Sequence, residues 1–303
     1  MPYLWMFDVD GTNARNKPPE KIFRETDIYT LPAPDGTRDL GLEHGLSEIE
    51  GHFTRIRTSK LNFKRPLSDE DWQWLCLFVA VAHVRTPALR DHMWDQFRGV
   101  RARLEEFMAE PPQESSMPAG YQSKGAPVTP EMLDNMVEDP MPMMLASTMK
   151  AVLPVMLNMN HIVFWTDDPL GFITSDNPCM WFDPTAHRRP PMARAVGIQT
   201  ADIEVTLPLS PQQCILFSHS QFQTGYMKAD RDMVNILNHR HAWHAPTTLI
   251  ACRNEVRAEW FEHPPMPDDA WENTHAEGAA ETWVNPNVPT LVGLPPLDGT
   301  TSG

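Results

Sequence analysis

The sequence has 303 residues, of which 41% are apolar and 21% are charged, with 10 Trp and 13 Phe. This length and aromatic content suffice for one large hydrophobic core or two modest ones and exclude a chain that is disordered throughout. The formal net charge of −15 argues against nucleic acid and anionic membrane as main partners, because like charges repel. A protein partner stays open, and the sequence indicates no particular small-molecule ligand.

The cellular compartment is predicted from the first residues and the cysteines. The start lacks the cationic region, apolar run and cleavage site of a signal peptide, and no stretch reaches the ~18 apolar residues of a membrane-spanning helix. The four cysteines are widely spaced and form no Cys-x-x-Cys pair; they are Cys76, Cys179, Cys214 and Cys252. We therefore expect reduced, buried thiols in a soluble cytoplasmic protein.

The chain is predicted to open with a strand and a helix. Apolar residues at 3–7, followed by Asp8-Val9-Asp10-Gly11, predict a short strand that ends in a tight turn. Apolar residues at helical spacing then predict a helix over about 41–57.

A second helix is predicted to begin after Ser68. Asp71 follows three residues later, close to a capping box, and apolar residues continue on one helical face. Pro87 falls inside this run and removes one backbone hydrogen bond. A kink is therefore expected near Arg85–Thr86.

Prolines and methionines mark the middle of the chain. Five prolines, with Ser and Gly, predict an exposed loop over 110–130. Methionine-rich helices are expected to follow as far as about residue 159, interrupted at Pro140, Pro142 and Pro154. Methionines at this density usually fill irregular gaps in a core.

The second half is predicted to be rich in strands. His161–Thr166 and Phe172–Thr174, separated by Asp167-Asp168-Pro169-Leu170-Gly171, predict a β-hairpin. One helix is expected at about 229–243. Further strands are predicted at 179–182, 202–207, 213–218 and 248–252.

The order of these elements predicts an α+β fold. The helical N-terminal and middle part would pack on a mainly antiparallel sheet from the C-terminal half, because helices come first and strands later. We expect residues 1–262 to form one domain and residues 263–303 to form a proline-rich tail.

The segment Phe7-Asp8-Val9-Asp10-Gly11-Thr12 resembles the first motif of the haloacid dehalogenase-like phosphatases, in which the two Asp act as nucleophile and acid/base. The rest of the chain does not follow that fold. A loop-rich stretch follows the motif, and Asp167-Asp168 precedes Thr174-Ser175, which is the wrong order for the later motifs. We favour a strand and turn here and retain the phosphatase as a minor alternative.

Several short segments in order resemble an uncharacterised family, domain of unknown function 4238, from residue 3 to about 252. They are Leu4-Trp5-Met6-Phe7-Asp8, Pro19–Lys21, Asp27-Ile28-Tyr29-Thr30, Leu42-Glu43-x-x-Leu46-x-x-Ile49-Glu50, Arg85-Thr86-Pro87, Ile173-Thr174-Ser175-Asp176-Asn177-Pro178, Pro208-Leu209-Ser210-Pro211 and Asn238. The resemblance implies a fold and candidate residues, and no known activity. Members usually carry a His-x-Pro-Gln-type segment before the first strand, which this sequence lacks. It is either a divergent member or a chain whose start lies upstream.

The candidate catalytic residues are Glu43, Glu50, Arg85 and Asp176. The two Glu are seven residues apart and share one helix face, and a buried guanidinium at Arg85 would need a carboxylate partner. The four groups would form an acid/base or metal site, or else a buried ion network that fixes a helix against the sheet. Which metal, if any, is left unknown. Candidate binding residues are Ser175, Asn177 and Asn238.

His239, His241 and His244 resemble a metal cluster at first sight, but 239 and 241 do not share a helix face and no Cys or second His pair completes the set. We favour a surface helix end. No Gly-x-Gly-x-x-Gly or Gly-Lys-Thr/Ser loop is present, so no cofactor is indicated.

Two functions therefore remain. The favoured one is a non-catalytic interaction or regulatory protein whose polar motifs are structural. The alternative is a hydrolase of phosphoester or glycosidic bonds that uses the carboxylate and Arg site.

Overall fold

A computed structural model describes residues 4–23, 31–32, 38–109, 134, 137, 140–186, 189–190, 192, 194 and 196–262. The predicted loop at 110–130 and the predicted tail at 263–303 lie outside these residues. Those two predictions, and the domain boundary at 262, therefore stay predictions.

The helices and strands confirm the α+β prediction. The helices are α1 (Gly41–Ser59), α2 (Asp69–Val84), α3 (Pro87–Ala109), α5 (Pro140–Met156) and α6 (Arg231–Trp243). The strands are β1 (Leu4–Asp8), β2 (Arg15–Lys17), β3 (Leu31–Pro32), β4 (Arg38–Asp39), β5 (Asn160–Trp165), β6 (Thr174–Ser175), β7 (Met180–Phe182), β8 (Glu204–Ser210), β9 (Gln213–Ser218), β10 (Gly225–Lys228) and β11 (Thr248–Ala251). Short 3-10 helices are η1 (Pro19–Lys21), η2 (Leu61–Phe63) and η5 (Ala258–Trp260).

The strands divide between two main sheets rather than one. The larger sheet has the order β10-β5-β9-β8-β7, and the smaller has the order β2-β1-β11-β6. Every described pair is antiparallel except β10 with β5. Among the described strands, the first, β1, therefore pairs with the last, β11, since Trp5 lies opposite Ala251.

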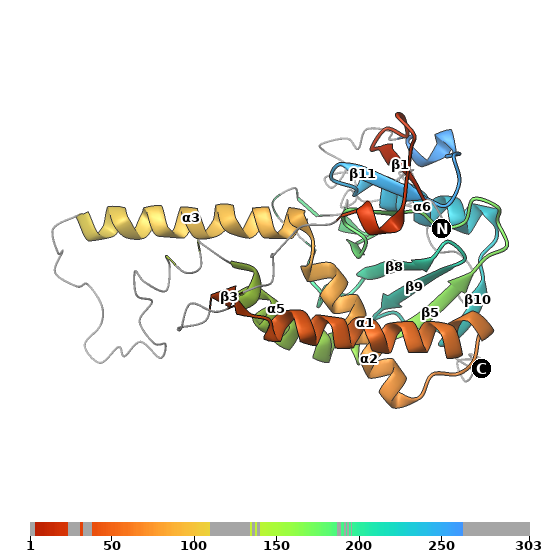
Figure 1. Ribbon diagram of the computed structural model, residues 1–303, viewed down its shortest axis with the longest axis horizontal. Helices are drawn as coiled ribbons and strands as arrows, with labels where there is room; N and C mark the ends of the chain where they lie inside the picture. The colour runs from red at the N-terminus through yellow and green to blue at the C-terminus, as the bar shows by residue number, and fades with distance from the viewer. Residues whose placement is uncertain are drawn as a thin grey trace, which may run out of the picture.

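The elements stack in layers (Figure 1), with the helices α1, α2 and α5 on one face of the larger sheet and α6 on the other. Alternate residues explain this, because successive side chains of a strand point to opposite faces. Ile215 and Phe217 of β9 pack with α2 and α5, whereas Cys214 and Leu216 pack with α6. The smaller sheet covers the far side of α6, so this helix lies between two sheets (Figure 1).

The start of α2 is confirmed, and the disruption predicted at Arg85–Thr86 is present as a break between two helices rather than as a kink. Ser68 and Asp71 form a reciprocal capping box. The helical run is then interrupted: α2 ends at Val84, and α3 begins at Pro87. The Thr86 hydroxyl accepts a hydrogen bond from the amide of Leu89 at 3.2 Å and so caps α3. Pro87 stands at the first position of α3, where no backbone donor is needed.

The predicted interruptions at Pro142 and Pro154 are corrected, whereas Pro140 is the residue at which α5 begins. α5 runs without a break from Pro140 to Met156. Pro140 and Pro142 lie in its first turn, where amide groups have no partner within the helix. Pro154 lies close to the last residue, so it costs only one backbone bond near the helix end.

The predicted hairpin over 161–174 is wrong. β5 pairs with β9 and β10 in the larger sheet, whereas β6 pairs with β11 in the smaller sheet. The segment between them is a crossover from one sheet to the other. No helix within the described part of the chain is both long and apolar enough to cross a membrane.

Candidate functional site

The structure brings together two of the four candidate catalytic residues. Arg85, directly after α2, donates to Glu50 of α1 at 2.5 Å. Both side chains contact solvent, with exposed fractions of 30% for Arg85 and 53% for Glu50. Glu43 lies two turns earlier on α1. A pair this exposed contributes little to stability.

Asp176 lies at the end of β6 and joins it to the start of β11. Its carboxylate accepts hydrogen bonds from the Thr247 hydroxyl and, at 3.1 Å, from the Thr247 amide. The Thr248 amide lies 3.4 Å away. These contacts hold the turn before β11 against the end of β6.

The side chains of Ser175 and Asn238 form hydrogen bonds with backbone groups. The Ser175 hydroxyl accepts from the amide of Asn177 at 3.0 Å and donates to its carbonyl at 2.9 Å. The carboxamide of Asn238 is fully buried in α6; it accepts from the amide of Ile173 at 3.0 Å and donates to the carbonyl of Gly171 at 2.8 Å. Asn238 thus holds the crossover segment against α6.

Gly171 in this crossover requires glycine. Its φ is +63°, in the left-handed region, and a Cβ there would lie 2.1 Å from the carbonyl oxygen of Pro211. The amide of Phe172 donates to that same carbonyl at 2.8 Å. The crossover is therefore held on two sides, by α6 and by the turn between β8 and β9.

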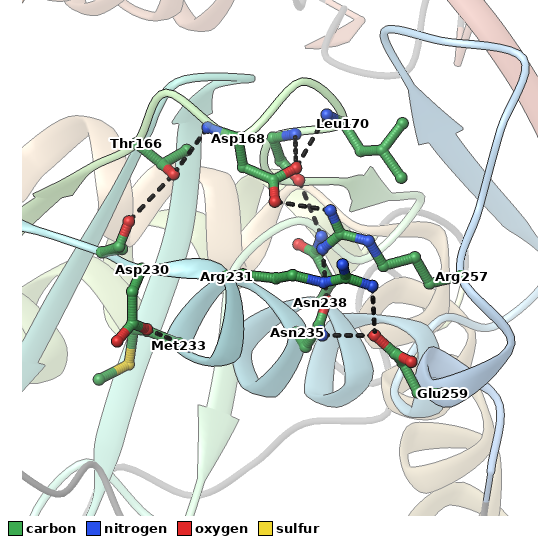
Figure 2. Close-up of polar contacts among 12 residues, drawn as sticks. Thr166, Asp168, Leu170, Asp230, Arg231, Met233, Asn235, Asn238, Arg257 and Glu259 are labelled. Atoms are coloured by element: carbon green, nitrogen blue, oxygen red, sulfur yellow. Dashed lines mark hydrogen bonds and ion pairs between the residues drawn. The ribbon is translucent and has the colours of Figure 1, made fainter.

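A polar cluster that the sequence analysis missed joins the crossover, α6 and the chain after β11 (Figure 2). Arg257 donates to Asp168 at 2.6 Å and to the side-chain oxygen of Asn235 at 2.6 Å. Asn235 also accepts from the indole of Trp260 at 3.0 Å and donates to Glu259 at 2.5 Å. The side chains of Asp168 and Arg257 are only 6% and 12% exposed.

The Asp168 carboxylate is stabilised in its charged form. Burial alone would raise its pKa, but hydrogen bonds from Arg257 and from the amides of Leu170 and Gly171 outweigh burial and lower the pKa below the usual Asp value. Those amides donate at 2.9 and 3.2 Å. Asp168 therefore fixes both the crossover backbone and the Arg257 guanidinium.

A pocket of about 530 Å³ lies beside this cluster. Three of the residues that line it are arginines and only one is acidic. The lining residues are Pro169, Leu170, Arg231, Arg253, Asn254, Glu255 and Arg257. We call this the arginine pocket. Its parts come from the crossover, the first residue of α6 and the segment before η5, so no local motif predicts it.

A second pocket of about 430 Å³ lies where the start of α2 meets β5 and β10. Several of its polar side chains already have partners. The Tyr226 hydroxyl donates to the carbonyl of Arg65 at 2.9 Å, and Ser68 serves in the helix cap. His161 stacks on Trp72 with 3.7 Å between ring centroids, and burial lowers its pKa to about 4. The arginine pocket is therefore the better candidate site.

His239 and His241 of α6 lie inside the protein, which corrects the predicted surface helix end for these two residues, whereas His244, directly after the helix, is exposed. His239 and His241 are 8% and 1% exposed. His241 lies 3.3 Å from the Thr206 hydroxyl, and His244 packs edge-on against Phe182. His239 and His241 face inward because α6 lies between two sheets. Within the described ranges, no three His, Cys, Asp or Glu side chains are arranged to hold a metal ion.

The turn after β1 supports the strand-and-turn interpretation. Asp8 accepts from Asn13 at 2.6 Å and from Arg15 at 2.5 Å, and Asp10 accepts from the hydroxyl and amide of Thr12. β1 itself lies in an antiparallel sheet between β2 and β11. The two aspartates thus stabilise a hairpin.

Comparison with known proteins gives one match. The family described as "Protein of unknown function (DUF4238)" matches residues 2–255. No curated protein and no solved structure matches the chain.

Proposed function

Since the chain belongs to DUF4238, a family of proteins of unknown function, we propose its function from its own contacts: it is a non-catalytic interaction or regulatory protein that acts by binding. The cytoplasm is the proposed setting. Its four cysteines are free thiols, and burial raises the pKa of Cys179 to about 12, so this thiol is unreactive at neutral pH. Free buried thiols are typical of proteins in a reducing compartment.

The observation that carries this proposal is how the candidate catalytic groups are engaged. Asp176 is bonded to the backbone and hydroxyl of Thr247, in the strand-end turn, and Glu50 pairs with Arg85 on the surface. Neither of the two pockets described above is lined by Glu43, Glu50, Arg85 or Asp176.

The arginine pocket also suits binding better than catalysis. Nucleophilic catalysis uses a Ser, Cys, Thr, Lys, His, Tyr or carboxylate that a neighbouring base or its surroundings activate. Among the side chains that line this pocket, Glu255 is the one group of these types. Glu255 alone is left as a base, without an acid partner on the lining.

The hydrolase alternative rests on Glu50 and Arg85. Their side chains remain partly exposed, so a substrate would be able to reach them. The haloacid dehalogenase-like alternative rests on Asp8 and Asp10, which the hairpin contacts already occupy.

Activity assays on matched variants test the proposal. Purified protein and the variants Glu50→Gln and Asp176→Asn are incubated with nitrophenyl phosphate, bis-nitrophenyl phosphate and nitrophenyl glycosides, with and without Mg²⁺, Mn²⁺ and Zn²⁺. Asp167→Asn is the control, because Asp167 is an exposed carboxylate paired with Lys228. We expect no turnover that depends on Glu50 or Asp176, and we expect Asp176→Asn to lower the thermal midpoint.

Turnover that Glu50→Gln or Asp176→Asn abolishes, with an unchanged thermal midpoint and full activity in Asp167→Asn, would refute the non-catalytic proposal. The hydrolase would then be the function. Turnover lost only in an Asp8→Asn variant would instead support the phosphatase alternative.

A further inference from the structure

We propose that the arginine pocket binds a small ligand that carries two or more phosphate groups. This inference rests on the proposed function, because it names what the non-catalytic protein binds. It is carried by the concentration of three guanidinium groups around one cavity on a chain whose net charge is −15.

Arg257 is the fixed part of the site. Its guanidinium is held between Asp168 and Asn235, each at 2.6 Å, and lies 5.7 Å from the ring centroid of Trp260. These contacts use two of the five N–H donors that a guanidinium carries. An arginine fixed in this way loses little side-chain entropy when a ligand binds.

Arg231 and Arg253 are available to a ligand at little cost. Arg231 is 68% exposed, and the carboxylate of Glu259 lies 3.7 Å from its guanidinium. Exposed ion pairs of this kind contribute little, so an anion displaces Glu259 easily. Within the part of the chain that the structure describes, no hydrogen bond or ion pair joins the Arg253 side chain to another residue.

On the pocket lining itself, three arginines and one carboxylate give an excess of positive charge, which favours an anion. The buried carboxylate of Asp168, which is not on the pocket lining, offsets the charge of Arg257. Glu259 offsets the charge of Arg231 weakly. Glu255 is the only carboxylate on the pocket lining. A ligand with one negative charge would gain little over these carboxylates, so a ligand with several is required.

The geometry of guanidinium favours phosphate. A guanidinium binds phosphate oxygens in a two-pronged manner, and three of them around a cavity match several oxygens at once. A volume of about 530 Å³ holds a small organic molecule. Pro169 and Leu170 supply an apolar wall for the part of such a molecule that has no charge.

The experiment is isothermal titration calorimetry of the full chain with inorganic pyrophosphate at low ionic strength, where charge interactions are least screened. The variants are Arg253→Ala and Arg231→Ala/Arg253→Ala. Arg103→Ala is the matched control, because Arg103 is an exposed residue of α3 that makes no hydrogen bond or ion pair with the described residues and changes the net charge equally. Citrate is titrated in parallel to separate phosphate from carboxylate recognition.

We expect one saturable site for pyrophosphate, weakened about tenfold by Arg253→Ala and further by the double variant, since a hydrogen bond to a charged group contributes about that factor. Arg103→Ala should bind as the unaltered protein does. Absence of saturable binding, or equal weakening by Arg103→Ala, overturns the site. Citrate that binds as tightly as pyrophosphate overturns the assignment to phosphate.

A phosphate-release assay on the same samples separates this inference from the proposed function. Pyrophosphate that is bound and not hydrolysed supports both. Pyrophosphate that is bound and hydrolysed, with the loss of both in Arg253→Ala, upholds the site and overturns the non-catalytic function. Failure to bind overturns the site alone.

Discussion

Replacing Asp168 with Asn tests whether the cluster behind the arginine pocket is organised by one carboxylate. Asp168 is 6% exposed and accepts from Arg257 at 2.6 Å and from the amides of Leu170 and Gly171. Asn keeps an oxygen that accepts from the two amides but carries no charge. Arg257, only 12% exposed, would then be a buried cation with Asn235 as its remaining partner.

The expected cost is about 3 kcal/mol of the free energy of unfolding. Removing one partner of a buried ion pair costs ~3–5 kcal/mol, because the other charge is left uncompensated. We expect the lower end, since the backbone bonds and the contact with Asn235 persist. The double variant Asp168→Asn/Arg257→Met should lose less free energy of unfolding than the two single variants lose in sum, because the two side chains interact directly.

Urea unfolding at pH 7, followed by tryptophan fluorescence, measures the change. Asp167→Asn is the control from the adjacent position, whose exposed side chain pairs with Lys228; it should leave the midpoint nearly unchanged. A loss below about 1 kcal/mol for Asp168→Asn, when a buried pair requires ~3 kcal/mol or more, would refute the argument.

The pH dependence gives an independent check. The folded pKa of Asp168 is lowered, so its stabilisation is fully present above the unfolded value of ~3.9 and is lost as pH falls through the folded pKa. The difference in free energy of unfolding between the unaltered protein and Asp168→Asn should therefore be constant from pH 7 to about 5 and should become smaller below pH 5. A difference that is unchanged at the lowest pH where both proteins fold would contradict a charge-based origin.

Three further predictions concern single residues. Gly171→Ala should lower the free energy of unfolding by about 2–5 kcal/mol, because the backbone is left-handed and the new Cβ would clash with Pro211. The control is Gly197→Ala, where a Cβ meets no atom. It should change the free energy of unfolding by less than ~0.5 kcal/mol in the same urea titration. Burial and the nearby positive charges of His244 and Arg240 lower the pKa of His241 to about 3. The free energy of unfolding should therefore be highest above pH ~6.5 and should fall by up to ~1.4 kcal/mol per pH unit below it. His241→Gln should reduce this fall, measured from urea unfolding midpoints at pH 7 and pH 5. Gly51→Ala, in the middle of α1 with open space around the new Cβ, should stabilise the protein by ~0.5–1 kcal/mol and raise its thermal midpoint.

Local signals in the sequence predicted individual elements well. The helix after Ser68 was predictable because its cap and its apolar spacing depend only on neighbouring residues. The family resemblance was confirmed over most of the chain. The break at Pro87 was predicted as a kink because the sequence shows the missing donor but not that Thr86 caps a new helix.

Pairing between distant segments was not predictable in the same way. Apolar runs on both sides of Asp167–Gly171 look like a hairpin, but which strand each run pairs with depends on Asn238, Pro211 and the second sheet. The histidines of α6 were expected at the surface because periodicity shows only which side chains share a helix face. It does not show that distant segments of the chain cover both faces of this helix. The arginine pocket joins residues 169–170, 231 and 253–257, so no stretch of sequence contains it.

The pairing of β1 with β11 determines when the protein completes its fold during synthesis. Trp5 and Phe7 belong to the apolar cluster that contains Leu249, Ala251 and Trp260. A ribosome makes β1 first and must release residues 248–251 before β1 has a partner on that side. The larger sheet and its helices come from residues 41–243 and are complete earlier. Through most of translation, therefore, the first strand keeps an exposed apolar side, which is the kind of segment that chaperones protect from aggregation.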